Sequence, residues 1–109
     1  MNGVFEVYKD QKSEYRFRLK ASNGQTILQS EGYTSKAGCM NGVESVKENA
    51  SKKERYETSV DKAGKYRFKL VAANKQTIGI SEGYEAEASM KGGIESVGRW
   101  APAAPVKEV

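Results

Sequence analysis

Five basic side chains alternate with apolar ones in two short stretches of the chain, and they are the clearest candidates for chemistry. These residues are Arg16, Arg18, Lys20, Arg67 and Lys69. In an extended strand, such alternation places basic residues on one face and apolar residues on the other. Basic residues on an open sheet, with Tyr8 nearby for stacking, are the elements of a surface for single-stranded nucleic acid. The alternative, which we favour, is a solvated face where Glu6 and Glu57 pair with the arginines across neighbouring strands.

A second candidate is the polar motif Ser-Glu-Gly-Tyr, which places Glu31 beside Tyr33 and Glu82 beside Tyr84. Acid–base chemistry needs two converging groups with shifted pKa values, and this motif alone does not supply them. We favour a structural role, in which the tyrosine anchors a helix start and the glutamate stabilises its positive end. The chain has no histidine, no P-loop glycine pattern and no metal-ligand cluster. We therefore predict no catalytic residue, no metal and no cofactor.

The elements that position these residues occur twice. Tyr15-Arg16-Phe17 recurs as Tyr66-Arg67-Phe68, so the offset is 66 − 15 = 51. Between 15–46 and 66–97, 18 of 32 positions are identical, whereas average composition gives about two by chance. Each copy of about fifty residues is close to the size at which a separate core is marginal. We expect one interlocked domain over residues 1–109, with repeats at approximately 1–53 and 54–109.

Each copy has the periodicity of strands followed by a helix. The alternating stretches predict strands, Asn23-Gly24 predicts a hairpin turn, and the residues before Asp10 and Asp61 predict a further strand in each copy. A polar start near Thr34-Ser35 can cap the first helix, and residues 106–109 predict a short edge strand. The spacing i, i+3, i+4, i+7 predicts an apolar helical stripe, which comprises Cys39, Gly42, Val43 and Val46 in one copy and Met90, Gly93, Ile94 and Val97 in the other.

Glycine on a helical stripe costs about 1 kcal/mol relative to alanine. We therefore expect the helices to approach the sheet closely at Gly42 and Gly93. Cys39, the only cysteine, is predicted to be a core residue rather than a nucleophile. Trp100, the only tryptophan, has Asn49 as its counterpart. An exposed tryptophan can anchor a partner, but we favour a plug that closes the helix end against the sheet.

The composition sets loose bounds on partners and location. The net charge of +4 and the pI of about 9.2 permit anionic partners, but no block of like charge is present. After Met1 no apolar stretch is long enough for a signal peptide or a membrane span. We expect a soluble, cytoplasmic protein that does not contact membranes.

Four motifs carry a family resemblance: Tyr-Arg-Phe-(Arg/Lys)-Leu, Ala-x-Asn-x-Gln-Thr-Ile, Ser-Glu-Gly-Tyr and Gly-(Val/Ile)-Glu-Ser-Val. Over nearly its whole length the chain resembles the YegP-like family of small bacterial and archaeal proteins. The resemblance implies an α+β fold of two tandem β(3)-α-β repeats that form one antiparallel sheet. Both helices would lie on one face, and the C-terminal strands would be exchanged between repeats. It further implies a monomer built as an internal pseudo-dimer, and it brings no established activity, substrate or catalytic residue.

We interpret the chain as a non-enzymatic binding or accessory module whose partner, nucleic acid or another protein, is unknown. The first hypothesis is a weak binder of anionic partners, such as single-stranded nucleic acid, through the open sheet face. The alternative is a protein–protein interaction module that uses a strand edge or the Trp100 tail. An enzyme that uses Glu31, Glu82 and the neighbouring tyrosines is the least supported hypothesis.

Overall fold

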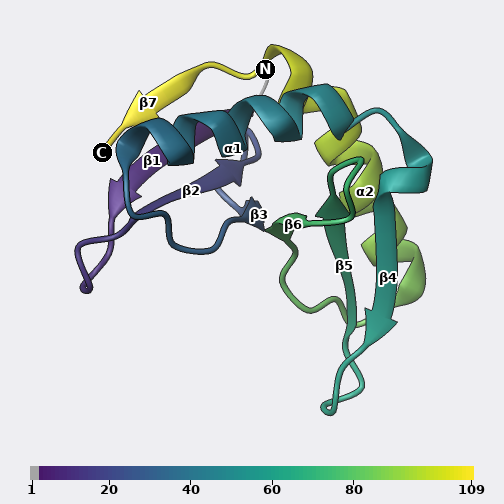
Figure 1. Cartoon of the computed structure of the whole chain (residues 1–109). Coiled ribbons are helices and arrows are strands. Elements are labelled where there is room, and N and C mark those ends of the chain that lie inside the picture. Colours follow the sequence, from purple (N-terminus) through teal and green to yellow (C-terminus); the bar gives the residue numbers. More distant parts are fainter. Residues whose placement is uncertain (1–2) are drawn as a thin grey trace.

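One seven-stranded sheet runs through the computed structural model, which describes residues 3–109 (Figure 1). The strand order is β4-β5-β6-β3-β2-β1-β7. The helices are α1 (Lys36–Asn49) and α2 (Glu87–Trp100), each followed by a short 3-10 helix, η1 (Lys53–Arg55) or η2 (Ala101–Ala103). The strands are β1 (Val4–Lys9), β2 (Tyr15–Lys20), β3 (Thr26–Gln29), β4 (Tyr56–Val60), β5 (Tyr66–Val71), β6 (Thr77–Ile80) and β7 (Val106–Glu108).

The strand after each helix joins the other half of the sheet. β4 follows α1 and pairs with β5 of the second copy, whereas β7 follows α2 and pairs with β1 of the first. The α+β class and the exchange of C-terminal strands are therefore confirmed. One detail differs, because β7 lies parallel to β1 and the sheet is mixed rather than purely antiparallel. The reason is the position of β1, which already occupies the antiparallel place beside β2. β7 therefore pairs with the outer edge of β1 and runs in the same direction as β1.

Both copies contribute to one buried cluster. Alternation along β2 and β5 turns Phe17, Leu19, Phe68 and Leu70 toward the helices, and all four are buried. α1 contacts strands β2, β5 and β6, and α2 contacts β3 and β5, so each helix covers strands from both copies. Burial of each such Leu or Phe stabilises the fold by about 1.5–3 kcal/mol. This packing agrees with the expectation that two copies of about fifty residues each share one core.

The glycines on the helical stripes lie against tyrosine rings. A Cβ atom on Gly42 would lie 2.9 Å from Phe17 Cε2 and would collide with the Tyr33 hydroxyl. The rings of Phe17 and Tyr33 stack with centroids 6.3 Å apart. The predicted close approach is confirmed, and the second copy repeats it with Gly93, Phe68 and Tyr84. The predicted cap is also present, because the Gly38 amide donates to Ser35 Oγ at 3.0 Å.

Two pairs of repeat-related turn residues have a positive φ, and only one member of each pair is glycine. Gly24 has a φ of 86° and its counterpart Lys75 has 71°. Gly64 has a φ of 81° and its counterpart Ser13 has 64°. Residues with a Cβ atom are disfavoured in this left-handed region by roughly 1 kcal/mol. Each copy therefore contains one strained turn that the other copy avoids.

We expect Ser13→Gly and Lys75→Gly each to raise the free energy of unfolding by about 1 kcal/mol, because glycine adopts a positive φ without strain. The two gains should add, since the turns lie in different halves of the sheet. Urea denaturation of both single variants and the double variant measures the effect. Gly24→Lys and Gly64→Ser are matched controls that should lower stability. Equal stability of glycine and non-glycine variants would contradict the explanation.

The two halves of the sheet meet at an angle. A single residue pair, Gln29 with Ile80, joins β3 to β6. Figure 1 shows both helices on one side of the bent sheet, whereas the β1-β2 and β4-β5 hairpins project on the other side. The face without helices is therefore concave. Among residues 3–109, no helix combines the length and the hydropathy needed to cross a bilayer.

Candidate binding site

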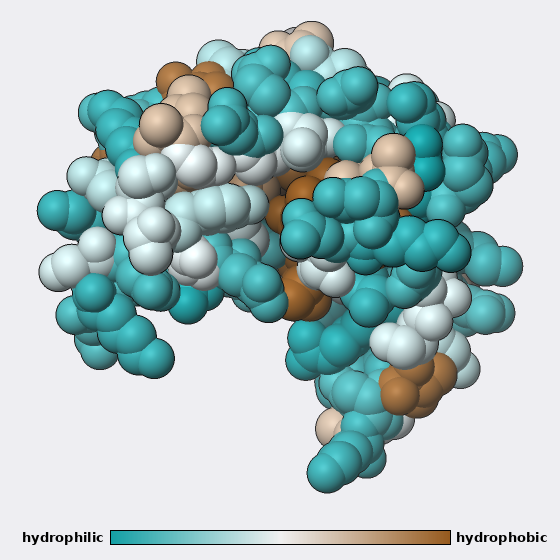
Figure 2. All heavy atoms as spheres, in the orientation of Figure 1, coloured by the Kyte–Doolittle hydropathy of each residue, from teal (hydrophilic) through white to brown (hydrophobic). Residues whose placement is uncertain are grey.

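The concave face carries the five basic side chains that strand alternation places there. Arg16, Arg18 and Lys20 come from β2, and Arg67 and Lys69 come from β5. Figure 2 shows mainly polar to intermediate surface on the two arms, with one hydrophobic patch low on the right arm and further hydrophobic surface between the arms. Each of the five basic side chains forms an ion pair with a carboxylate. The positive charge of the face is therefore largely compensated within the protein.

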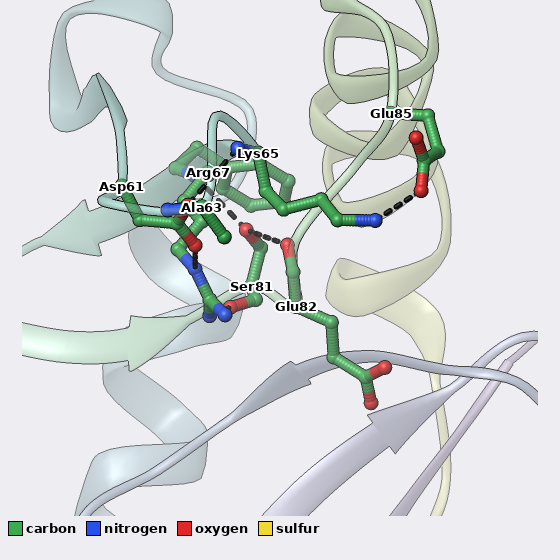
Figure 3. A network of polar contacts seen from close by, with 8 residues as sticks. Asp61, Ala63, Lys65, Arg67, Ser81, Glu82 and Glu85 are labelled. Carbon is green, nitrogen blue, oxygen red and sulfur yellow. Dashed lines mark hydrogen bonds and ion pairs between the residues drawn. The ribbon is translucent and has the colours of Figure 1, made fainter.

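A polar network holds Arg67 beside the turn between β4 and β5 (Figure 3). Arg67 Nε donates to Asp61 Oδ2 at 2.7 Å, and Arg67 Nη1 donates to the Ser81 carbonyl at 3.3 Å. Asp61 Oδ1 also accepts from the backbone amides of Ala63 and Lys65, each at 2.9 Å. One carboxylate thus shapes the turn and orients the guanidinium. The first copy has the same network, formed by Asp10, Lys12, Glu14, Arg16 and Ser30.

The serine of the Ser-Glu-Gly-Tyr motif has a structural role that the sequence analysis did not assign. Ser81 is fully buried, and its Oγ accepts from the Phe68 amide and donates to the Glu82 carbonyl, both at 2.9 Å. The hydroxyl thereby satisfies backbone groups beside the end of β6. Ser30 makes the equivalent bonds in the first copy. This role could have been found in the sequence, because Asp, Arg and Ser recur at the same offset of 51 in both copies.

The network predicts a loss of stability in acid. Hydrogen bonds from Arg16 and Arg67, followed by those from backbone amides, lower the pKa of Asp10 and Asp61 below the ordinary value of 3.8. The stability linked to a lowered pKa is complete above the unfolded-state value and is lost as the pH falls through the folded-state value. We therefore expect the urea midpoint to fall below about pH 4. Asp61→Asn should weaken this pH dependence, and identical acid profiles of both proteins would contradict the assignment.

In the first copy, Tyr8 fills the space beside Arg18. The Arg18 guanidinium carbon lies 4.6 Å from the centroid of the Tyr8 ring. Glu6 binds the same guanidinium, with 2.7 Å between Arg18 Nε and Glu6 Oε1, and this hydrogen bond lowers the pKa of Glu6. The pairing of Glu6 with Arg18 is the cross-strand arrangement expected from the sequence. The aromatic ring proposed for ligand stacking therefore already stacks on an arginine of the protein.

In the second copy, the corresponding space is open. Ser59 takes the position of Tyr8, and Lys69 takes that of Arg18. A depression of about 310 Å³ lies there, which we call the Ser59 hollow. Lys69 Nζ lies 3.4 Å from Glu57 Oε1 at its rim. The hollow is lined by Glu57, Thr58, Ser59, Arg67, Phe68, Lys69 and Ile80.

The outer edge of β4 is free, whereas that of β1 is covered by β7. The Phe5 amide donates to the Pro105 carbonyl at 2.9 Å, and the Val109 amide donates to the Val7 carbonyl at 3.0 Å. In the described residues, β4 has β5 as its only neighbouring strand. Val7 is 2% exposed as a result, whereas its counterpart Thr58 is an exposed residue. The pseudo-symmetry of the sheet is therefore incomplete at β4.

The Glu and Tyr residues of the repeated polar motif lie in different surroundings. Burial raises the pKa of Tyr33 and Tyr84, whose rings pack against the helices. Glu31 and Glu82 are exposed, and Figure 3 shows the Glu82 side chain directed away from the Arg67 network. Over residues 3–109, no group of three His, Cys, Asp or Glu side chains is arranged to hold a metal ion.

Trp100 and Cys39 both contribute to packing. Trp100 is half-buried at the end of α2 and packs against the core, and the Arg99 guanidinium carbon lies 5.7 Å from its ring centroid. One side of the ring therefore packs against the core and the other is exposed, and the role of Trp100 as a plug or a partner anchor stays a prediction. Cys39 is fully buried, and burial raises the pKa of its thiol, which disfavours the reactive thiolate.

The model of a domain of unknown function, DUF1508, matches the chain twice, at residues 10–57 and 61–108. The chain belongs to the DUF1508 family. A UPF0339 protein in the ptx operon 5′ region of Stutzerimonas stutzeri is 56% identical over 109 residues, which cover 100% of this chain and 98% of that protein. The UPF0339 protein YegP of Escherichia coli strain K12 is 47% identical over 97 residues, 89% of this chain and 88% of that protein. The solution NMR structure of YegP from E. coli has a TM-score of 0.94 at 44% identity and covers 99% of this chain and 93% of that one.

The two DUF1508 segments divide the sheet in a consistent way. The first segment contains β2, β3, α1 and the start of β4, and the second contains β5, β6, α2 and β7. Each DUF1508 segment therefore ends in the strand that crosses to the other half. β1 precedes the first segment. It lies beside β2 in the same way as β4 lies beside β5. The expected YegP-like family and tandem repeat are confirmed, and the DUF1508 family has no assigned function.

Proposed function

We propose that this protein is a non-enzymatic interaction module that binds an extended segment of another protein along the free edge of β4. One observation carries the proposal: β7 covers the edge of β1, whereas no strand within residues 3–109 covers the repeat-related edge of β4. A sheet edge presents N–H and C=O groups that pair with an added strand. The pairing of β7 with β1, a parallel strand of three residues, supports an occupant of the same kind at β4.

Thr58 supplies the backbone groups for the added strand. It pairs with Phe68 as Val7 pairs with Phe17, and the Val7 carbonyl accepts a hydrogen bond from β7. Because backbone groups in an antiparallel pair point alternately toward and away from the neighbouring strand, those of Thr58 point away from β5. The Tyr56 amide already donates to the Lys53 carbonyl. The free edge therefore comprises residues 58–60.

The repeat-related counterpart of a lysine beside β7 suggests the charge of the partner. On the β1 side, Lys36 at the start of α1 forms an ion pair with Glu108 of β7. The repeat-related counterpart of Lys36 is Glu87, which is exposed at the start of α2. A segment that docks on β4 as β7 docks on β1 would place its third residue next to Glu87. A lysine or arginine at that position provides charge complementarity.

The test uses a peptide derived from the protein's own C-terminal strand. The probe Ala-Pro-Val-Lys-Lys-Val corresponds to residues 104–109 with a lysine in place of the glutamate. In amide NMR titrations of the wild-type protein, we expect shifts at residues 58–60 and 87. Thr58→Pro removes the outward-pointing amide without breaking the β4–β5 ladder, and should weaken binding about tenfold.

Two controls accompany this titration. The unmodified peptide Ala-Pro-Val-Lys-Glu-Val should bind about two- to fivefold more weakly, which corresponds to the free energy that one exposed ion pair contributes. Glu87→Lys should reverse this preference, because the carboxylate then lies on the peptide. If no shifts appear at the β4 edge with either peptide, or if Thr58→Pro binds as well as the wild type, the proposed function is wrong.

A second candidate is the binding of an anionic partner, such as single-stranded nucleic acid, on the concave face. Five basic side chains on this face are paired with only four carboxylates, which are Glu6, Asp10, Glu57 and Asp61. The existing ion pairs compete with phosphate groups, so we expect weak, salt-sensitive binding. Titration with short single-stranded DNA and RNA at low and moderate salt tests it. Shifts on Arg16, Arg18, Arg67 and Lys69 that fade with salt support it, and no shifts at low salt exclude it.

A further inference from the structure

We infer that the Ser59 hollow binds an aromatic side chain of the partner segment, and this inference rests on the function proposed for the β4 edge. The first copy of the repeat shows what such a hollow accepts. There the Tyr8 ring occupies the equivalent place, 4.6 Å from the Arg18 guanidinium carbon. The replacement of Tyr8 by Ser59 in the second copy leaves space for a ring that the chain itself does not provide.

The lining of the hollow suits an aromatic ring. Ile80 is 36% exposed and supplies an apolar surface, whereas its counterpart in the first copy is the polar Gln29. Lys69 replaces Arg18 as the neighbouring cation. A cation beside the face of an aromatic ring is attracted by the ring quadrupole. The second copy therefore combines an empty ring position with a cation and an added apolar contact.

Strand register selects which partner residue enters the hollow. On the β1 side, Glu6 lies beside Lys107 and Val7 beside Glu108, so the next residue, Val109, follows beside Tyr8. Val109 and Tyr8 line the same surface depression. When this register is transferred to β4, the residue at the position of Val109 lies beside Ser59. The partner segment therefore carries an aromatic residue directly after the basic residue that faces Glu87.

Two peptides that differ in this residue test the inference. Ala-Pro-Val-Lys-Lys-Tyr should bind the wild-type protein about fivefold more tightly than Ala-Pro-Val-Lys-Lys-Val, because its ring adds apolar and cation–π contacts. The additional amide shifts should lie at Ser59, Lys69 and Ile80. Ser59→Tyr installs the first-copy residue and should abolish the advantage of the tyrosine peptide. The valine peptide, which carries no ring, is the reference against which this advantage is measured in both proteins.

Two further variants keep the test independent of the folding of Ser59→Tyr. Ile80→Gln installs the first-copy residue on the apolar side of the hollow and should also reduce the preference for the tyrosine peptide. Tyr8→Ser opens an equivalent hollow in the first copy. With p-cresol, the tyrosine side chain alone, we expect shifts around Ser59 in the wild type. In Tyr8→Ser we expect shifts around both positions.

The outcomes separate the two proposals. If both peptides shift β4 equally and Ser59→Tyr changes nothing, the aromatic site is wrong and the edge-binding function stands. If neither peptide causes amide shifts at β4, the edge-binding function is wrong. The proposed binding of an aromatic side chain from a docked segment is then wrong as well. If p-cresol then also fails to shift Ser59 and Lys69, the hollow has no affinity for aromatic rings.

Discussion

Gly93→Val is expected to lower the free energy of unfolding by about 3 kcal/mol, whereas Gly92→Ala, one residue earlier in α2, should raise it by about 1 kcal/mol. A Cβ atom on Gly93 would lie 3.1 Å from Phe68 Cε2 and would collide with the Tyr84 hydroxyl. Nothing lies within 4 Å of a Cβ atom on Gly92. Adjacent glycines of one helix therefore respond with opposite sign, because only one of them faces the tyrosine.

Urea denaturation of the two variants measures this difference directly. Gly92→Ala is the matched control, since it changes helix propensity at a neighbouring position without a steric conflict. Tyr84→Phe combined with Gly93→Val should recover part of the loss, because it removes the colliding hydroxyl. If Gly93→Val were as stable as the wild type, the packing of Tyr84 against α2 would be wrong.

Removal of residues 105–109 is expected to lower the free energy of unfolding by about 3 kcal/mol. These residues cover Phe5 and Val7, which are 0% and 2% exposed, and they supply the two hydrogen bonds at Phe5 and Val7. Partial exposure of two apolar core side chains accounts for a loss of this size. Thermal unfolding and amide exchange at Phe5 measure the effect, and unchanged stability would contradict the role of β7.

Two additions make this truncation more informative. Glu108→Gln removes only the exposed ion pair with Lys36 and should change stability by less than about 1 kcal/mol, which separates the charge from the strand. The peptide of residues 104–109, added to the truncated protein, should bind at β1 and restore stability by mass action. Its affinity measures what a parallel strand of this length contributes at a sheet edge, and it is the reference value for binding at β4.

Most elements of the fold could be predicted because their signals are local. Phe17 and Leu19 alternate within one strand, and Cys39 and Val46 share one helical stripe, so no distant contact is needed to recognise either. The direction of β7 could not be predicted in this way. It depends on β1 already lying beside β2, which is a property of the assembled sheet.

The candidate site was predictable only in part for the same reason. The basic face follows from alternation, and the pairing of Glu6 with Arg18 follows from strands that lie side by side. Asp10 and the Ser30 carbonyl reach Arg16 only after the chain has turned twice, so their roles appear only in three dimensions. The Ser59 hollow is an empty space, and it becomes visible only when the side chains of both copies are compared in place.

The pairing of the first strand with the last also affects how the protein is made. During synthesis β1 leaves the ribosome before β7 does, and its outer edge stays open until residues 105–109 have emerged. The first half of the sheet therefore cannot reach its final state before β7 is available, although such segments otherwise fold as they emerge. Closure of the β1 edge is a late step of folding, and a chain that stops before residue 105 keeps this edge open.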